Sequence, residues 1–192
     1  MRDDPGGTEG RIVVVGASAG GLTAVSELLI ELPADYPWPV VVASHSGPKS
    51  YLTEALSLRR DMRIAIETAT DGMALKGGRA IVLPGATHGL VIGPRLHLSP
   101  LVRESGFRPS VDALFMTAAA SYGRRAVAVV LSGTMNDGMR GAQVIYDMGG
   151  MTIVQDPADA ERAEMPQNVI DADHPRRVMS APDLGSWLAG IA

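Results

Sequence analysis

The sequence contains no cysteine among its 192 residues and only four histidines. The lack of cysteine excludes disulfides, thiolate metal sites, iron–sulfur clusters and cysteine nucleophiles. So few histidines leave little material for a metal site, and we expect neither a metal nor a cofactor. An excess of cations is also missing, because 17 Lys and Arg stand against 21 Asp and Glu, giving a net charge of −4. A nucleic-acid partner held by a basic face is therefore not expected.

Long hydrophobic runs are absent as well. The longest runs, such as 12–15 and 127–131, are far shorter than the roughly 20 residues of a membrane-spanning helix. Residues 1–10 are polar and rich in Gly and Asp, unlike a signal peptide, and predict a disordered tail. With 46% hydrophobic and 20% charged residues, the remaining chain, 11–192, suits one folded domain. We expect a cytoplasmic protein without membrane insertion.

Short β-branched runs alternate with amphipathic stretches along this domain. The runs lack polar alternation, which is typical of strands buried on both faces of a parallel sheet. They span 12–15, 40–43, 80–83, 126–131 and, more weakly, 151–154; the helical stretches span 22–32, 51–58, 110–122 and 138–148. Residues 89–99 predict a β-hairpin around Gly93-Pro94. The sequence therefore predicts an α/β fold: a doubly wound, mostly parallel sheet with an antiparallel hairpin, and helices on both faces.

Ser18 is the candidate nucleophile. It lies in a Gly-x-Ser-x-Gly turn after the first strand, and functional groups gather beyond the carboxyl ends of such strands. Backbone amides beside it can face a developing oxyanion, so Ala17, Ala19 and Gly20 are candidate oxyanion or substrate-binding residues. Two alternatives remain: Ser18 caps the following helix, or the glycines cradle a phosphate. The stretch from Gly16 to Gly21 lacks the middle glycine of the dinucleotide-binding fingerprint, which argues against a dinucleotide as the ligand.

His45 and Asp137 are the candidate partners of this serine. His45 follows the second strand, where a neutral imidazole can accept the Ser18 proton. Asp137 follows the strand at 126–131 and can orient the imidazole; its alternative role is to cap the helix at 138–148. The order Ser, His, Asp differs from that of α/β-hydrolases. Weaker candidates for the third position lie in or near helices or before a proline: Asp112, Asp147 and Asp156.

The other three histidines differ in how strongly their positions suggest a role at the candidate site. His88 follows the strand at 80–83 and either lines the site or makes a local hydrogen bond in the turn before the hairpin. His97 in the hairpin and His174 in a polar segment are expected to be non-catalytic.

Several motifs occur together in one order. They are VVVGASAGG at 13–21, the strand ending in His45, PGATH at 84–88, RPSVDALF at 108–115 and LSGTMNDG at 131–138, followed by Gly149-Gly150, Gln155-Asp156 and Met165-Pro166. This combination resembles the catalytic domain of the chemotaxis protein-glutamate methylesterases (CheB type) over nearly the whole chain from Arg11. The resemblance implies a hydrolase that removes methyl esters from glutamates on the cytoplasmic helices of chemoreceptors and often deamidates glutamines. It places the catalytic triad on Ser18, His45 and Asp137.

The sequence departs from the family pattern beside two triad members. The usual His-Met-Pro is replaced by His45-Ser46-Gly47-Pro48, and the usual Gly-Met-Gly-x-Asp by Gly133-Thr134-Met135-Asn136-Asp137. Thr134 and Met135 are therefore candidate substrate or oxyanion residues in altered form. A methionine in place of a glycine also predicts strain if the turn needs a positive φ.

The family usually carries an N-terminal receiver domain, for which the ten residues before the first strand leave no room. We expect a free-standing domain, an excised domain or part of a fusion, with a separate receiver protein as a possible regulator in trans. The alternative function is a non-catalytic binding or regulatory module of the same fold, in which the altered loops prevent turnover.

Overall fold

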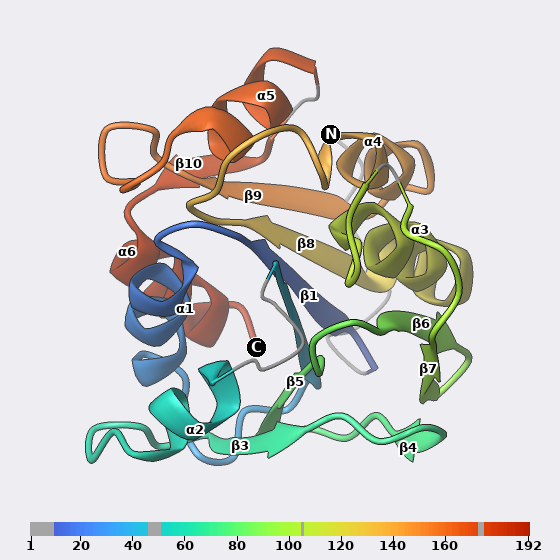
Figure 1. Cartoon of the computed structure of the whole chain (residues 1–192). Helices are drawn as coiled ribbons and strands as arrows, with labels where there is room; N and C mark the ends of the chain where they lie inside the picture. The colour runs from blue at the N-terminus through green and yellow to red at the C-terminus, as the bar shows by residue number, and fades with distance from the viewer. Residues whose placement is uncertain (1–9, 46–50, 105, 173–174) are drawn as a thin grey trace.

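The computed structural model describes residues 10–45, 51–104, 106–172 and 175–192, and a parallel sheet of seven strands forms its centre. The strands run in the order β10-β9-β8-β1-β2-β5-β3 (Figure 1). Their bounds are β1 Ile12–Ala17, β2 Val40–Ser44, β3 Ala65–Thr68, β5 Arg79–Val82, β8 Ala126–Val130, β9 Met151–Gln155 and β10 Arg177–Met179.

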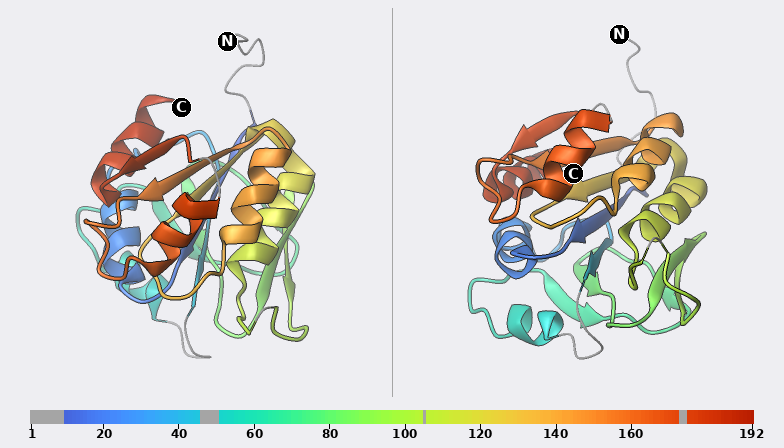
Figure 2. Two further views of the ribbon diagram at one scale, coloured as in Figure 1. Left: turned by 90° about the horizontal axis from the view of Figure 1, so that it is seen from above. Right: turned by 45° about the horizontal axis from the view of Figure 1, so that its top comes forward.

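Helices cover both faces of this sheet, as predicted (Figures 1 and 2). Strand β1 shows why: Val13 and Val15 pack with α1, α2 and α6 in one apolar cluster, whereas Ile12 and Val14 pack with α3, α4 and α5 in another. Every residue of β1 is buried, because successive side chains point to opposite faces and both faces are covered. The helices are α1 Gly21–Ile30, α2 Leu52–Ser57, α3 Val111–Tyr122, α4 Met139–Asp147, α5 Glu164–Ala172 and α6 Ala181–Gly190, with a short 3₁₀ turn at Gly123–Arg125.

The predicted hairpin is confirmed and extended by one strand. β6 (His88–Ile92) and β7 (Arg95–Ser99) pair antiparallel, and β4 (Met73–Ala74) joins the other edge of β7. This small sheet packs against α3. From β7 the chain leads to the start of α3, where the candidate site lies.

Some elements were not predicted. The edge strands β3 and β10 are short and partly exposed, so they lack the continuous apolar run that marks the central strands. Helices α5 and α6 were also missed, although Ser180 caps α6 by accepting from the Asp183 N–H and Pro182 follows at its start. The predicted disordered tail, apart from Gly10, lies outside the described residues, as does His174.

The order of the strands decides where a site can form. β1 lies between β2 and β8; the strands that follow β1 first build the β2-β5-β3 side of the sheet, and the chain then crosses to the other side of β1 to add β8, β9 and β10. The crevice at such a reversal, beyond the carboxyl ends of the strands, is the usual binding place of an open α/β sheet. Within the described parts of the chain, no helix is both long and apolar enough to cross a membrane.

Candidate active site

Ser18 stands on a turn that hydrogen bonds hold in place. Its N–H donates to the Ser132 carbonyl at 2.9 Å, and its carbonyl accepts from the Gly21 N–H at 2.8 Å. Gly20, which lies within this turn, has a φ of +76°. A Cβ on this residue would lie 2.6 Å from the Ser132 hydroxyl oxygen. Only glycine allows both this conformation and this close approach. The turn therefore directs the half-buried Ser18 outward at the start of α1.

His45 connects the serine to the carboxylate. Its backbone N–H donates to the Ala17 carbonyl at 3.1 Å, which fixes it at the end of β2. Its Nδ1 lies 3.1 Å from Ser18 Oγ, and its Nε2 lies 2.7 Å from Asp137 Oδ2. A carboxylate accepts only, so the ring proton belongs on Nε2 and Nδ1 is left as the acceptor that faces the serine. The three predicted triad residues thus form one hydrogen-bonded chain.

Asp137 is anchored to the N-terminus of α3. Its Oδ2 accepts from the Val111 N–H at 2.7 Å and its Oδ1 from the Asp112 N–H at 2.9 Å, and the Ser110 hydroxyl lies 3.2 Å from Oδ1. The first amides of a helix have no partner within the helix and favour an anion. The alternative prediction that Asp137 caps the helix that follows it is wrong, because its carboxylate caps α3 and not α4.

Asp112, in the first turn of α3, caps the start of α4 in the same way. Its Oδ1 accepts from the Gly138 N–H at 3.0 Å and from the Gly141 N–H at 2.7 Å. Asp137 and Asp112 thus cap each other's helix across the α3–α4 contact. Burial raises the pKa of Asp112 to about 6; the charges of Asp137 and Glu104 add to this, and the two amide hydrogen bonds oppose it.

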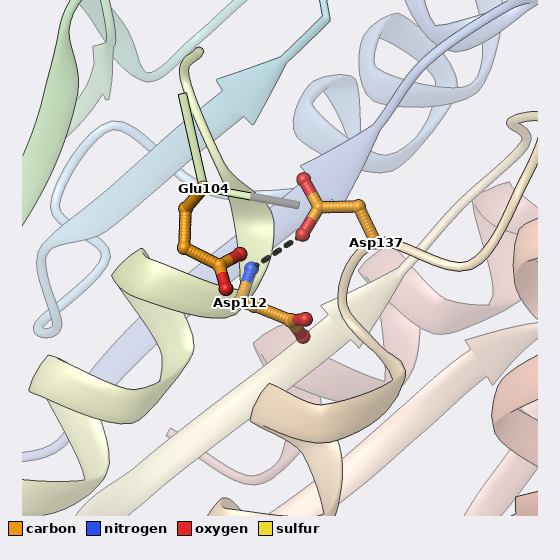
Figure 3. Close-up of side chains that lie close together, drawn as sticks. All are labelled: Glu104, Asp112 and Asp137. Carbon is orange, nitrogen blue, oxygen red and sulfur yellow. Dashed lines mark hydrogen bonds between the residues drawn. The ribbon is translucent and has the colours of Figure 1, made fainter. Parts of the chain in front are cut away.

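Glu104, Asp112 and Asp137 bring three carboxylates together, and Figure 3 shows the Asp112 amide donating to Asp137. Such a group could hold a cation. Its oxygens, however, already accept from the amides described above, and Glu104 adds an ion pair with Arg140 at 3.0 Å and a contact with the Ser110 hydroxyl at 3.2 Å. We therefore assign the cluster to the support of Asp137.

Phe107 is a functional candidate that sequence reasoning missed. Its ring stacks on the His45 imidazole, with centroids 4.2 Å apart and planes 11° apart. Backbone hydrogen bonds between Glu104 and Phe107, at 2.8 and 3.1 Å, close the turn that carries it. No spacing in the sequence links residue 107 to residue 45, so only the fold reveals this contact.

The loop between β8 and Asp137 completes the rim of the site. Met135 has a φ of +70° and the residue is 56% exposed. The turn therefore does need the left-handed conformation, as the comparison with a family glycine suggested, and the methionine is not part of the core. A non-glycine residue in this region costs roughly 1–2 kcal/mol.

The remaining predicted residues lie at different depths. Ala19 is exposed and Thr134 half-buried, while Ala17 is fully buried and supports His45 from beneath. His88 is buried: its Nδ1 accepts from the Ser110 N–H at 3.2 Å, and its Nε2 lies 3.0 Å from the Val102 carbonyl. It also lines a surface cavity of about 420 Å³. His97 lies away from the triad and pairs with Asp71 at 3.4 Å.

Comparisons with known proteins identify the family of this chain. The family model "CheB methylesterase" matches residues 13–188. Protein-glutamate methylesterase/protein-glutamine glutaminase 5 of Anaeromyxobacter dehalogenans (strain 2CP-C) is 41% identical over 183 residues, which is 91% of this chain and 49% of that protein. A putative enzyme of the same name from Leptospira interrogans is 34% identical over 177 residues, 88% of each chain.

A solved structure shows the same fold. The Thermotoga maritima CheB methylesterase catalytic domain superposes with a TM-score of 0.86 at 28% identity, covering 96% of this chain and 100% of that one. The chain spans about half the length of several curated relatives, including the first two. The family match extends across almost the whole domain and includes all three residues of the hydrogen-bonded chain. This chain therefore belongs to the CheB methylesterase family.

Proposed function

We propose that this chain is a serine hydrolase that removes methyl esters from glutamate side chains of chemoreceptor-like proteins and also deamidates glutamines. The observation that carries the proposal is the continuous chain from Ser18 Oγ through the imidazole of His45 to Asp137. Its members follow three adjacent strands, β1, β2 and β8, at the reversal point of the sheet. The names of the relatives support the choice of ester and amide substrates.

The first half of the reaction acylates the serine. Ser18 Oγ attacks the carbonyl carbon of the glutamate ester while its proton passes to His45 Nδ1. Asp137 accepts from Nε2–H and stabilises the imidazolium that forms. When the tetrahedral intermediate collapses, the bond to the methoxy oxygen breaks and His45 returns the proton to it, so that methanol leaves. With a glutamine side chain the leaving group is ammonia.

The second half regenerates the enzyme. A water molecule gives a proton to His45 Nδ1 and attacks the acyl carbon, and the bond to Ser18 Oγ then breaks with the proton returning to that oxygen. The product is a glutamate carboxylic acid, which ionises at neutral pH. Each tetrahedral intermediate carries an oxyanion, for which the N–H groups of Ala19, Gly20 and Thr134 are our candidate donors.

The partners follow from the substrate. A methylated side chain must reach Ser18 between the turn at 18–20 and the loop at 133–137, whose Ala19 and Met135 are exposed. We propose the cytoplasmic helices of a chemoreceptor as the substrate and a separate receiver-domain protein as a regulator. The triad needs no metal or other cofactor for this chemistry.

The decisive experiment measures methanol released from methylated receptor fragments by the parent chain and by Ser18→Ala. We expect release from the parent only. A serine-reactive phosphonate probe, located by mass spectrometry, is expected to label Ser18 in the parent. No release and no labelling at Ser18 would favour a non-catalytic module of this fold. Labelling without methanol release would keep the hydrolase and reject the substrate.

A further inference from the structure

Met135 adopts a backbone conformation that its own side chain does not explain. Its φ of +70° lies in the left-handed region that residues with a Cβ avoid. The residue is 56% exposed, so packing in the core does not impose this conformation. Something outside the residue must hold it.

Two side chains of α5 bind the peptide groups on either side of Met135. Glu164 Oε2 accepts from the Met135 N–H at 2.8 Å, and Asn168 Nδ2 donates to the Met135 carbonyl at 2.7 Å. The two residues are four apart and therefore lie on the same face of the helix. Together they fix the peptide planes before and after the strained residue.

Backbone contacts extend this attachment to the nucleophile. The Gly133 N–H donates to the Arg162 carbonyl at 3.0 Å, and the Met165 N–H donates to the Gly133 carbonyl at 3.0 Å. A Cβ on Gly133 would lie 2.8 Å from the Cβ of Ser18, so the loop touches the nucleophile directly. The loop at 133–137 is thus held between α5 and Ser18, with Asp137 at its far end.

We propose that Glu164 and Asn168 are positioning residues that clamp Met135 and so hold the loop at 133–137 in its active geometry. This inference rests on the proposed function and refines its site. The clamp fixes Thr134 and Asp137 on the two sides of Met135. It also removes the Met135 N–H from the set of oxyanion donors, because that N–H already binds a carboxylate.

The test is a double-mutant cycle that combines Glu164→Ala, which removes half of the clamp, with Met135→Gly, which removes the strain at residue 135. Glu164→Ala is expected to lower kcat toward a small activated ester about tenfold. In a Met135→Gly background the same substitution is expected to lower kcat less than twofold, because glycine adopts a positive φ without a clamp. Asn168→Ala is expected to show the same pattern. In both cases KM for the small ester changes less than kcat.

Two matched controls separate the clamp from helix stability and from charge. Asp171 is another exposed carboxylate of α5, bonded within the helix to Gln167 at 2.8 Å, so Asp171→Ala is expected to leave kcat unchanged. Glu164→Gln keeps an acceptor oxygen and is expected to retain most of the activity. An Asp171→Ala loss as large as that of Glu164→Ala overturns the proposal.

Hydrogen exchange of the Met135 amide gives a readout that does not depend on turnover. Exchange is expected to accelerate at least tenfold in Glu164→Ala and to stay slow in Asp171→Ala. Equal exchange in the parent and in Glu164→Ala, an unchanged or higher kcat, or an equal loss of kcat in both backgrounds overturns the clamp. If the parent shows neither ester turnover nor labelling of Ser18, the proposed function fails, and the exchange rates alone decide whether the clamp exists.

Discussion

The two ends of the proposed triad are built in different ways. At the carboxylate end, the Asp137 side chain has no exposed surface and is held by amides and a hydroxyl at the start of α3. At the serine end, Ser18 is half-buried beside the exposed residues Ala19 and Met135. There the exposed residue Met135 is held by two side chains of α5, the exposed Glu164 and the half-buried Asn168.

The two ends therefore differ in how much sequence change they tolerate. A buried carboxylate that loses its donors, or a buried helix end that loses its acceptor, costs several kcal/mol, so the Asp137 end tolerates little change. Substitutions at an exposed rim usually cost little stability. The rim therefore suits the two residues at which we expect this chain to depart from the family pattern, Thr134 and Met135.

The largest effect is expected at the reacting pair. Ser18→Ala and His45→Ala should each lower kcat by between roughly 10⁴- and 10⁶-fold, because proton transfer and attack need both groups together. The double variant should lose little more than either single variant. Steady-state turnover of a small activated ester measures all three. Additive losses would show that the two residues do not act as one unit.

Asp137→Asn tests the buried end of the comparison. An amide that donates to His45 Nε2 would favour the tautomer with its proton on Nδ1, which cannot accept from Ser18. We expect kcat to fall roughly 10³- to 10⁴-fold. Unlike Ser18→Ala, this variant should also lower the free energy of unfolding, since Val111 and Asp112 lose a charged acceptor. Urea denaturation of both variants measures the two free energies of unfolding. Equal values would show that the amides at the start of α3 do not depend on the charge of Asp137.

Much of the fold could be predicted because the central strands are buried on both faces. Runs such as 12–15 and 126–131 are apolar without interruption, which leaves a parallel, covered sheet as the natural interpretation. The edge strand Ala65–Thr68 is partly exposed and gave no such signal. Helix α5 contains Pro166 in its first turn. A helix tolerates proline there, but in a sequence pattern a proline usually indicates the end of a helix.

The sequence indicates which residues of the site follow the strands of the sheet, but it does not indicate which side chains contact one another. Ser18, His45 and Asp137 could be found because each follows a strand whose carboxyl end faces the same edge. The mutual capping of α3 and α4 depends on how two helices pack, which no local pattern encodes. For the same reason His88 was ambiguous: its two ring contacts, to Ser110 and Val102, arise from segments that the sequence separates.

The titration of Asp112 gives a further test of the buried end of the site. Its pKa is raised from 3.8 to about 6 in the folded protein, so between these values the folded state holds a proton that the unfolded state has lost. This group therefore makes the protein less stable as pH rises from about 4 to about 6, and adds no further change above that. A shift of two pKa units corresponds to about 3 kcal/mol.

Asp112→Asn removes this titration and keeps an oxygen for the amides of Gly138 and Gly141. The unfolding free energy of the parent minus that of the variant is expected to fall as pH rises from 4 to 6 and then to level off. Urea denaturation at pH 4, 5, 6 and 7 measures it. A difference that is independent of pH would mean that Asp112 ionises normally and that the buried end is more solvated than its contacts indicate.

The smallest effect concerns Phe107, which links the two ends by stacking on the His45 ring. Phe107→Leu keeps apolar bulk but loses the flat face, and aromatic pairs contribute roughly 0.5–1.5 kcal/mol beyond their buried area. If the stack holds the imidazole in line with Ser18, kcat should fall about tenfold with KM little changed, since 1.4 kcal/mol is tenfold in rate. Phe107→Tyr keeps the ring and is the matched control. A raised KM at constant kcat would instead make Phe107 a substrate contact, and the imidazole would then owe its orientation to Asp137 and Ser18 alone.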